Sequence, residues 1–135
     1  MYAVPFEAGH VGALGFDSVP ADAARALEGA YAVTLMADGK PILAAGVIPM
    51  WEDRGFLWAF MSPAADRRVF RALHTFAKMF VANLPFRRLE AAVEVGFEAG
   101  HRWVRSLGFV CEAPLARSFR ADGKDCALYA LVKEI

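Results

Sequence analysis

The middle of the chain constrains the fold more than any other part. Two short apolar runs, Phe56–Met61 and Leu89–Val95, flank a segment with apolar residues at intervals of three and four. That spacing predicts a long helix with one broad buried face. Ser62-Pro63 is typical of a helix start, with Ser as the N-cap and Pro at the first helical position. The face consists of Val69, Phe70, Leu73, Phe76, Ala77, Phe80 and Val81.

This strand–helix–strand order predicts a right-handed crossover that makes the two strands parallel. Asn83-Leu84-Pro85 predicts the end of the helix. Two more strands are predicted before the crossover, Ala30–Ala37 and Pro41–Pro49, because Asp38-Gly39 between them is a strong hairpin signal. Trp51–Gly55 predicts the next turn. The three strands up to Met61 therefore form an antiparallel meander.

The two ends of the chain supply the remaining elements. Ala3–Leu14 is predicted to hold a short strand and a turn, and Ala21–Glu28 a weak helix. After the crossover, Phe97–Leu107 is predicted as a second, shorter helix that stops at Gly108. The last segments are a strand, a loop or hairpin tip and a final strand, at Phe109–Glu112, Arg117–Lys124 and Cys126–Lys133 respectively.

These elements predict an α+β fold with a central mixed sheet of six or seven strands and three or four helices. With 135 residues, the chain has the length of one domain, and residues 1–135 are predicted to form it. A hydrophobic content of 57% rules out intrinsic disorder. We see no transmembrane run and no signal peptide, so a cytoplasmic location is expected. Cys111 and Cys126 are expected to be buried thiols, and no metal-binding spacing occurs.

The charges are balanced overall but unevenly distributed. Fifteen basic and fifteen acidic residues give zero net charge, which argues against a nucleic-acid or membrane-surface binder. Residues 1–66 contain eight acidic and three basic residues, whereas residues 67–135 contain seven acidic and twelve basic ones. The basic residues often come in pairs. Solvated surface explains most of them, and an anion site in the second half is the alternative.

Two C-terminal segments resemble the GNAT acyltransferase superfamily. Gly100–Phe109 (GHRWVRSLGF) is similar to the last helix and "LGF" motif of that fold, and Arg120–Tyr129 (RADGKDCALY) to the hairpin that follows it. The order of elements extends the resemblance over nearly the whole chain. It implies a GNAT fold and an N-acyltransferase that uses acetyl-CoA or another acyl-CoA. The pattern is most similar to short GNAT-like proteins of phages and prophages, which would place the protein in the host cytoplasm or the virion.

The resemblance also implies where a cofactor would bind. In that superfamily, acyl-CoA lies where two parallel strands separate, here Phe56–Met61 and Leu89–Val95, and its pyrophosphate meets the start of the following helix. The implied contacts are Phe60, Met61, Ser62, Arg67, Arg68, Arg71 and Gly100. The superfamily's pyrophosphate loop is rich in glycine, but this chain has no glycine between Gly55 and Gly96. Its frequent general-acid Tyr corresponds to Val104.

Three arginines, Arg67, Arg68 and Arg71, fall in the first turns of the long helix. Basic residues are unfavourable there, so a bound phosphate would offset their cost; Asp66 and solvent screening are the alternative. Catalytic candidates are Glu94 and His101, either of which could accept a proton from an amine, and Tyr129, whose hydroxyl could reach the site. The structural alternatives are a solvated strand end, a surface or interface histidine and a half-buried aromatic.

Three functions from different classes remain open. The first is acyl transfer to a small-molecule or protein amine. The second is a catalytically inactive binding or virion-assembly protein. The third is a small-molecule binder whose ligand is not CoA. The high hydrophobic content further predicts an exposed apolar patch near Trp103, Phe109, Leu115 and Phe119, covered by a second copy or a protein partner.

Overall fold

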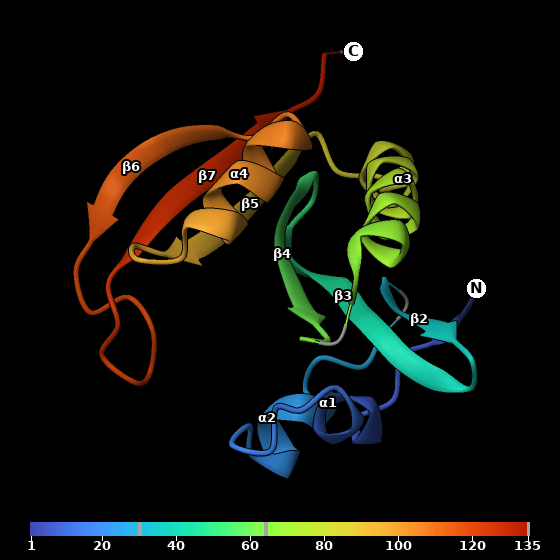
Figure 1. The fold of residues 1–135 in the computed structure, drawn as a ribbon. Helices are drawn as coiled ribbons and strands as arrows, with labels where there is room; N and C mark the ends of the chain where they lie inside the picture. Colours follow the sequence, from blue (N-terminus) through green and yellow to red (C-terminus); the bar gives the residue numbers. More distant parts are fainter. Residues whose placement is uncertain (30, 64, 135) are drawn as a thin grey trace. The chain divides into compact units, whose positions relative to one another are not determined.

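A computed structural model describes residues 1–29, 31–63 and 65–134 (Figure 1). Seven strands and four helices occur within these ranges. In chain order they are β1 (Tyr2–Pro5), α1 (Gly9–Ala13), α2 (Ala21–Arg25), β2 (Ala32–Ala37), β3 (Lys40–Trp51), β4 (Arg54–Met61), α3 (Arg67–Asn83), β5 (Arg88–Glu94), α4 (Glu98–Ser106), β6 (Val110–Ala116) and β7 (Cys126–Val132).

The strands form one mixed sheet in the order β1-β2-β3-β4-β5-β7-β6. Strands β4 and β5 are parallel, with Arg54–Phe56 of β4 facing Arg88–Glu90 of β5. The predicted crossover and mixed α+β sheet are therefore confirmed. Asp38 and Gly39 form the predicted β2–β3 turn, both with positive φ, as a two-residue hairpin of this kind requires. The predicted start of this hairpin at Ala30 lies outside the described residues.

The chain divides into two compact units. The first unit contains Met1–Ile48 and Leu57–Ala82, and the second contains Pro49–Phe56 and the chain from Asn83 onward. Strand β4 contributes to both, because its first three residues belong to the second unit and the rest to the first.

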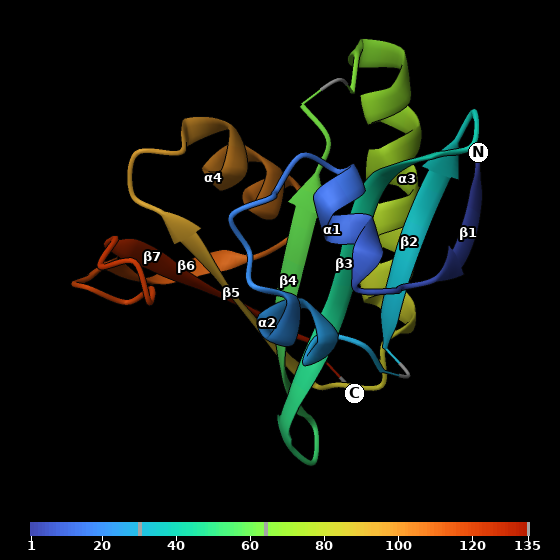
Figure 2. The same cartoon turned by 90° about the horizontal axis from the view of Figure 1, so that it is seen from below.

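The first unit has its core between the short N-terminal helices and the strands. Helices α1 and α2 lie on one face of the strands of this unit and α3 on the other (Figure 1 and Figure 2). Phe6, Val11 and Leu14 are buried here, and the half-buried Trp58 packs against them. Gly46 permits this packing, since a Cβ at that position would lie 2.6 Å from the Trp58 ring.

Helix α3 begins later than the sequence predicts. Ser62 follows β4, where its N–H donates to the carbonyl of Ile42 (2.9 Å). It lies five residues before Arg67, the first residue of α3, so Ser62 is not the N-cap. Asp66 takes that role, because its carboxylate accepts the Val69 N–H (2.9 Å). The described residues between β4 and Arg67, which are Ser62, Pro63, Ala65 and Asp66, form a connection instead of a first helical turn. The predicted end at Asn83 is confirmed.

The second unit is built on strands β5, β7 and β6. Side chains of β5 alternate between buried and half-buried, and Val93 pairs with Ala127 of β7 on the buried face. Helix α4 packs against β5 (Figure 1). Gly100 lets the helix approach closely, since a Cβ there would lie 2.6 Å from the Phe97 ring and 3.0 Å from Val93. Packing thus accounts for this glycine.

Three further expectations need correction. The N-terminal stretch contains helix α1 where only a turn is predicted, because few apolar residues mark so short a helix. Strand β6 extends to Ala116, beyond its predicted end at Glu112. The predicted apolar patch is incomplete: Leu115 and Phe119 are exposed, but Phe109 is buried and Trp103 is half-buried. No described helix is long and apolar enough to cross a membrane.

Candidate functional site

The second unit contains a buried histidine–tyrosine pair. His101 of α4 is only 7% exposed and Tyr129 of β7 only 2%. The His101 Nδ1 atom lies 2.7 Å from the Tyr129 hydroxyl, and Nε2 lies 2.9 Å and 3.0 Å from the carbonyl oxygens of Glu94 and Val95. One side chain thus connects α4 to the end of β5 and to β7.

The partners of His101 determine its tautomer. Carbonyl oxygens only accept hydrogen bonds, so Nε2 carries the proton and donates it to Glu94 and Val95. In the neutral ring Nδ1 is then the acceptor, and the Tyr129 hydroxyl donates to it. Burial raises the pKa of Tyr129, and nearby Arg105 only partly opposes that rise. The raised pKa keeps the hydroxyl protonated at neutral pH. Neither nitrogen of His101 remains available to take a proton from a substrate directly.

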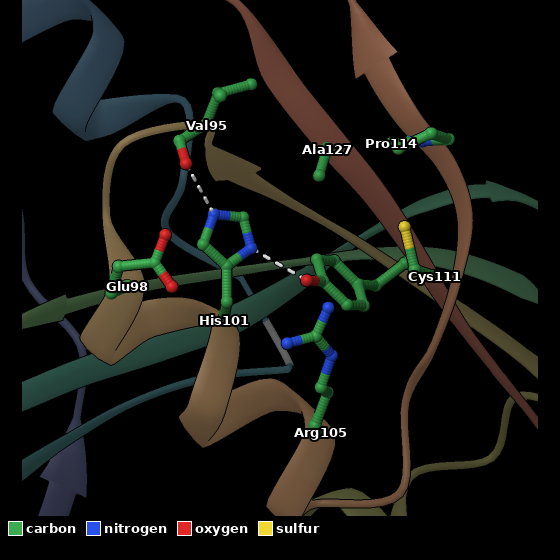
Figure 3. Close-up of a pocket in the computed structure, with 8 residues that line it drawn as sticks. Val95, Glu98, His101, Arg105, Cys111, Pro114 and Ala127 are labelled. Carbon is green, nitrogen blue, oxygen red and sulfur yellow. Dashed lines mark hydrogen bonds between the residues drawn. The ribbon is translucent and has the colours of Figure 1, made fainter.

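A small pocket adjoins this pair, with a volume of about 190 Å³ (Figure 3). Its lining comes from the end of β5, from α4 and from both C-terminal strands: Val95, Glu98, His101, Arg105, Cys111, Pro114, Ala127 and Tyr129. The Arg105 guanidinium lies over the Tyr129 ring at 5.7 Å. Glu98, His101 and Arg105 share one face of α4 because they are spaced three and four residues apart. Of these three residues, only His101 is a catalytic candidate by residue type, but the spacing in the sequence places all three on one face.

Glu94 contacts His101 through its backbone carbonyl, not through its carboxylate. Its carboxylate instead pairs with Lys124 (3.2 Å) and Arg120 (3.8 Å) of the β6–β7 loop and is about one-third exposed. Phe119 of the same loop stacks with Phe56 of β4, with ring centroids 6.4 Å apart. The catalytic candidates therefore separate into a partly exposed carboxylate next to this loop and a buried pair beneath α4.

The cofactor candidates lie in the first unit, except for Gly100. Phe60 packs against the core next to Phe16, with ring centroids 5.1 Å apart. Arg67, Arg68 and Arg71 are all exposed, and within the described parts of the chain no ion pair involves them. The nearest acid in sequence, Asp66, caps the helix with its own carboxylate. The start of α3 therefore combines three exposed arginines with one acidic cap.

Charged side chains also connect three strands of the second unit. Glu90 of β5 accepts hydrogen bonds from Arg54 of β4 and from Arg88, and Arg88 also pairs with Glu112 of β6. Hydrogen bonds from Arg54, and then from Arg88, hold the pKa of Glu90 below its ordinary value. Every charge in this network is compensated, so we assign it a structural role.

Packing and hydrogen bonding account for three other side chains, those of His10, Cys111 and Cys126. His10 of α1 hydrogen-bonds Thr34 of β2 (2.7 Å), which gives it a partner that the sequence did not suggest. Burial raises the pKa of the Cys126 thiol, while Cys111 is half-buried and lines the pocket. Across the described ranges, no group of three or more histidines, cysteines and carboxylates could hold a metal ion.

Solved structures show which fold this is. The ribosomal-protein-S18-alanine N-acetyltransferase of Escherichia coli matches 99% of this chain with 94% of its own, with a TM-score of 0.75 and 19% identity. A GNAT-family acetyltransferase of Bacillus cereus matches with a TM-score of 0.72 and 11% identity, over 99% of this chain and 98% of its own. The ribosomal-protein-alanine N-acetyltransferase of Brucella melitensis matches with a TM-score of 0.71 and 14% identity, over 98% of this chain and 100% of its own. The chain therefore has the GNAT fold.

Comparisons of sequence give no match. No protein-family model matches the chain, and no curated protein matches it. At identities of 11–19%, the matches to solved structures describe the fold, and a function has to be argued from the sites themselves.

Proposed function

We propose that this protein is an N-acyltransferase that moves an acyl group from acyl-CoA to an amine. The observation that carries the proposal is the match of almost the whole chain to solved N-acetyltransferases, including the parallel β4–β5 pair connected by α3. Fold alone does not determine activity. The basic start of α3 gives the proposal a second, chemical basis.

The phosphate groups of CoA would bind at the start of α3. The backbone N–H groups of a helix N-terminus favour an anion, and exposed Arg67, Arg68 and Arg71 add mobile donors. Long guanidinium side chains can reach phosphates that the glycine-free backbone cannot approach closely. Phe60, Met61 and Ser62 lead into this segment and would contact the rest of the cofactor. Gly100 is explained by packing and is not needed for this site.

In the proposed reaction, the amine nitrogen attacks the thioester carbonyl carbon of acyl-CoA. A C–N bond forms, the C–S bond breaks, and CoA leaves as its thiolate. The amine loses one proton, which Glu94 would accept directly or through water, because its carboxylate is the least buried of the three catalytic candidates. His101 and Tyr129 would hold the end of β5 in place without exchanging protons with substrate.

Thermal unfolding with acetyl-CoA and with desulfo-CoA tests this proposal. A ligand that binds only the folded state raises the melting temperature by mass action. We expect both compounds to raise it, and the double variant Arg67→Ala/Arg68→Ala to lose the effect. Lys78→Ala is the matched control, because Lys78 is an exposed base farther along α3. KM values rarely exceed about 1 mM. A melting temperature that stays unchanged at about 10 mM acetyl-CoA, tenfold that limit, would therefore refute acyl-CoA use.

A catalytically inactive binding protein is the second candidate. Asp66 already places a negative charge at the start of α3, and Val104 cannot donate a proton. Both observations favour a GNAT fold without turnover, for which a phage or prophage origin and a role in virion assembly remain predictions. If acetyl-CoA stabilises the protein but no CoA thiol is released with any amine, this second candidate is supported.

A further inference from the structure

The pocket beneath α4 contains two opposite charges that do not pair with each other. Glu98 and Arg105 both line it, on the same face of α4 and two helical turns apart. Within the described residues, neither forms an ion pair. Figure 3 shows both side chains reaching toward the space around the His101 ring. The pocket thus offers one acidic and one basic group to the same ligand.

The helix dipole explains only part of this arrangement. An acid in the first turn and a base in the last turn are each favourable, and Glu98 and Arg105 occupy those turns. The dipole, however, sets no requirement for the side of the helix on which they lie. Here both line the pocket, together with Cys111 and Tyr129 of the facing strands. That common orientation would let one ligand contact both charges.

The rest of the lining limits the size and polarity of the ligand. About 190 Å³ corresponds to roughly six water molecules at ~30 Å³ each, which is below the ~300 Å³ of sites for drug-sized ligands. Val95, Pro114 and Ala127 provide apolar walls. The Tyr129 hydroxyl donates its proton to His101, so its oxygen can still accept a hydrogen bond.

From these features we propose that the pocket binds a small zwitterion of amino-acid size. Its ammonium group pairs with the Glu98 carboxylate and approaches the Tyr129 oxygen, while its carboxylate pairs with the Arg105 guanidinium. A short apolar stem lies against the apolar walls. This site uses none of the residues proposed to bind CoA, and it exists whether or not the protein transfers acyl groups.

Ligand titration with glycine, β-alanine and 4-aminobutyrate tests the proposal. Amide resonances of α4 are followed by NMR and the melting temperature is measured in parallel. A ligand with a Kd of about 1 mM, added at about 10 mM, increases the ratio of folded to unfolded protein about elevenfold. We expect at least one of the three to produce this effect. Propionate and propylamine, with one charge each, should produce much smaller changes at equal ionic strength.

Charge-removing variants locate the binding. Glu98→Gln and Arg105→Gln should each abolish the response to the zwitterion, because each removes one of its two partners. Arg102→Gln is the matched control, since Arg102 is an exposed base on α4 that does not line the pocket. All three positions are exposed, so the variants should fold, which circular dichroism checks. Lack of response to all three zwitterions, an equal response to propionate, or an equal loss in Arg102→Gln would overturn the proposal.

Discussion

At the scale of single residues, the His101–Tyr129 pair gives the sharpest prediction. Tyr129→Phe removes the hydroxyl that donates to Nδ1 of His101 and leaves that nitrogen unpaired in a buried position. An unsatisfied buried polar group costs about 1–3 kcal/mol, so the free energy of unfolding should fall by that amount. Urea denaturation measures the change. Tyr2→Phe, at an exposed position, is the control and should be neutral.

The sequence identified these residues but not their arrangement. His101 and Tyr129 were candidates because of their residue types, while the alternatives placed them at the surface or half-buried. Both turn out to be buried, because the β5–β7 register and the close approach of α4 at Gly100 bring them together. Contacts between residues so far apart in the sequence cannot be predicted from the local spacing of residues. The i, i+3, i+7 pattern of Glu98, His101 and Arg105, in contrast, was visible in the sequence.

At the scale of elements, the start of α3 depends on Asp66. Its carboxylate caps the helix, so Asp66→Ala should lower the free energy of unfolding by about 0.5–2 kcal/mol. Asp66→Asn keeps a side-chain acceptor and should retain most of the stability. Urea denaturation followed by circular dichroism compares the two variants. Equal stabilities of Asp66→Ala and the unmodified protein would show that the cap contributes nothing.

The network across β4, β5 and β6 predicts how stability depends on pH. Arg54 and Arg88 hold the pKa of Glu90 below its ordinary value, so the charged form stabilises the folded state. This contribution is complete above the ordinary carboxylate pKa and is lost as the pH falls through the lowered one. Glu90→Gln should therefore lower stability at neutral pH by about 1.5–3 kcal/mol and flatten its decline in acid. Urea denaturation from neutral to acidic pH measures both effects.

The control for this network is Glu52→Gln, in the exposed turn between β3 and β4. It should change neither the stability at neutral pH nor the acid-dependent decline. An acid profile of Glu90→Gln that matches the unmodified protein would contradict the assignment. The sequence predicts solvated surface for most of the paired basic residues, to which Arg88 belongs. The ion pairs of this network depend on strand register, which sequence spacing does not reveal.

Most of the elements themselves were predictable. The crossover, the Asp38-Gly39 hairpin and the last strand follow from turn residues and apolar periodicity, which act over a few residues. The start of α3 is not predictable in this way, because both Ser62 and Asp66 could cap a helix and local sequence does not choose between them. In the structure the Ser62 N–H donates to the carbonyl of Ile42, and the helix begins after Asp66.

At the scale of the whole molecule, the boundary between the two units predicts cooperative unfolding. It runs through β4, so neither unit can unfold without disrupting a strand that the other needs. We expect one transition, with tryptophan fluorescence and circular dichroism giving the same midpoint in urea. Two separate midpoints would instead indicate two independently folding parts, and would contradict the single domain expected from length.

The irregular edge strand β6 has a consequence for concentrated solutions. Its pairing with β7 shifts register twice between Cys111 and Ala116, and Pro114 lacks an N–H group. An edge of this kind offers no continuous ladder of donors and acceptors to a second chain. In a chain with 57% hydrophobic residues, the β6 edge of the sheet is therefore a poor template for adding strands of further molecules, as growth into stacked β-fibrils requires.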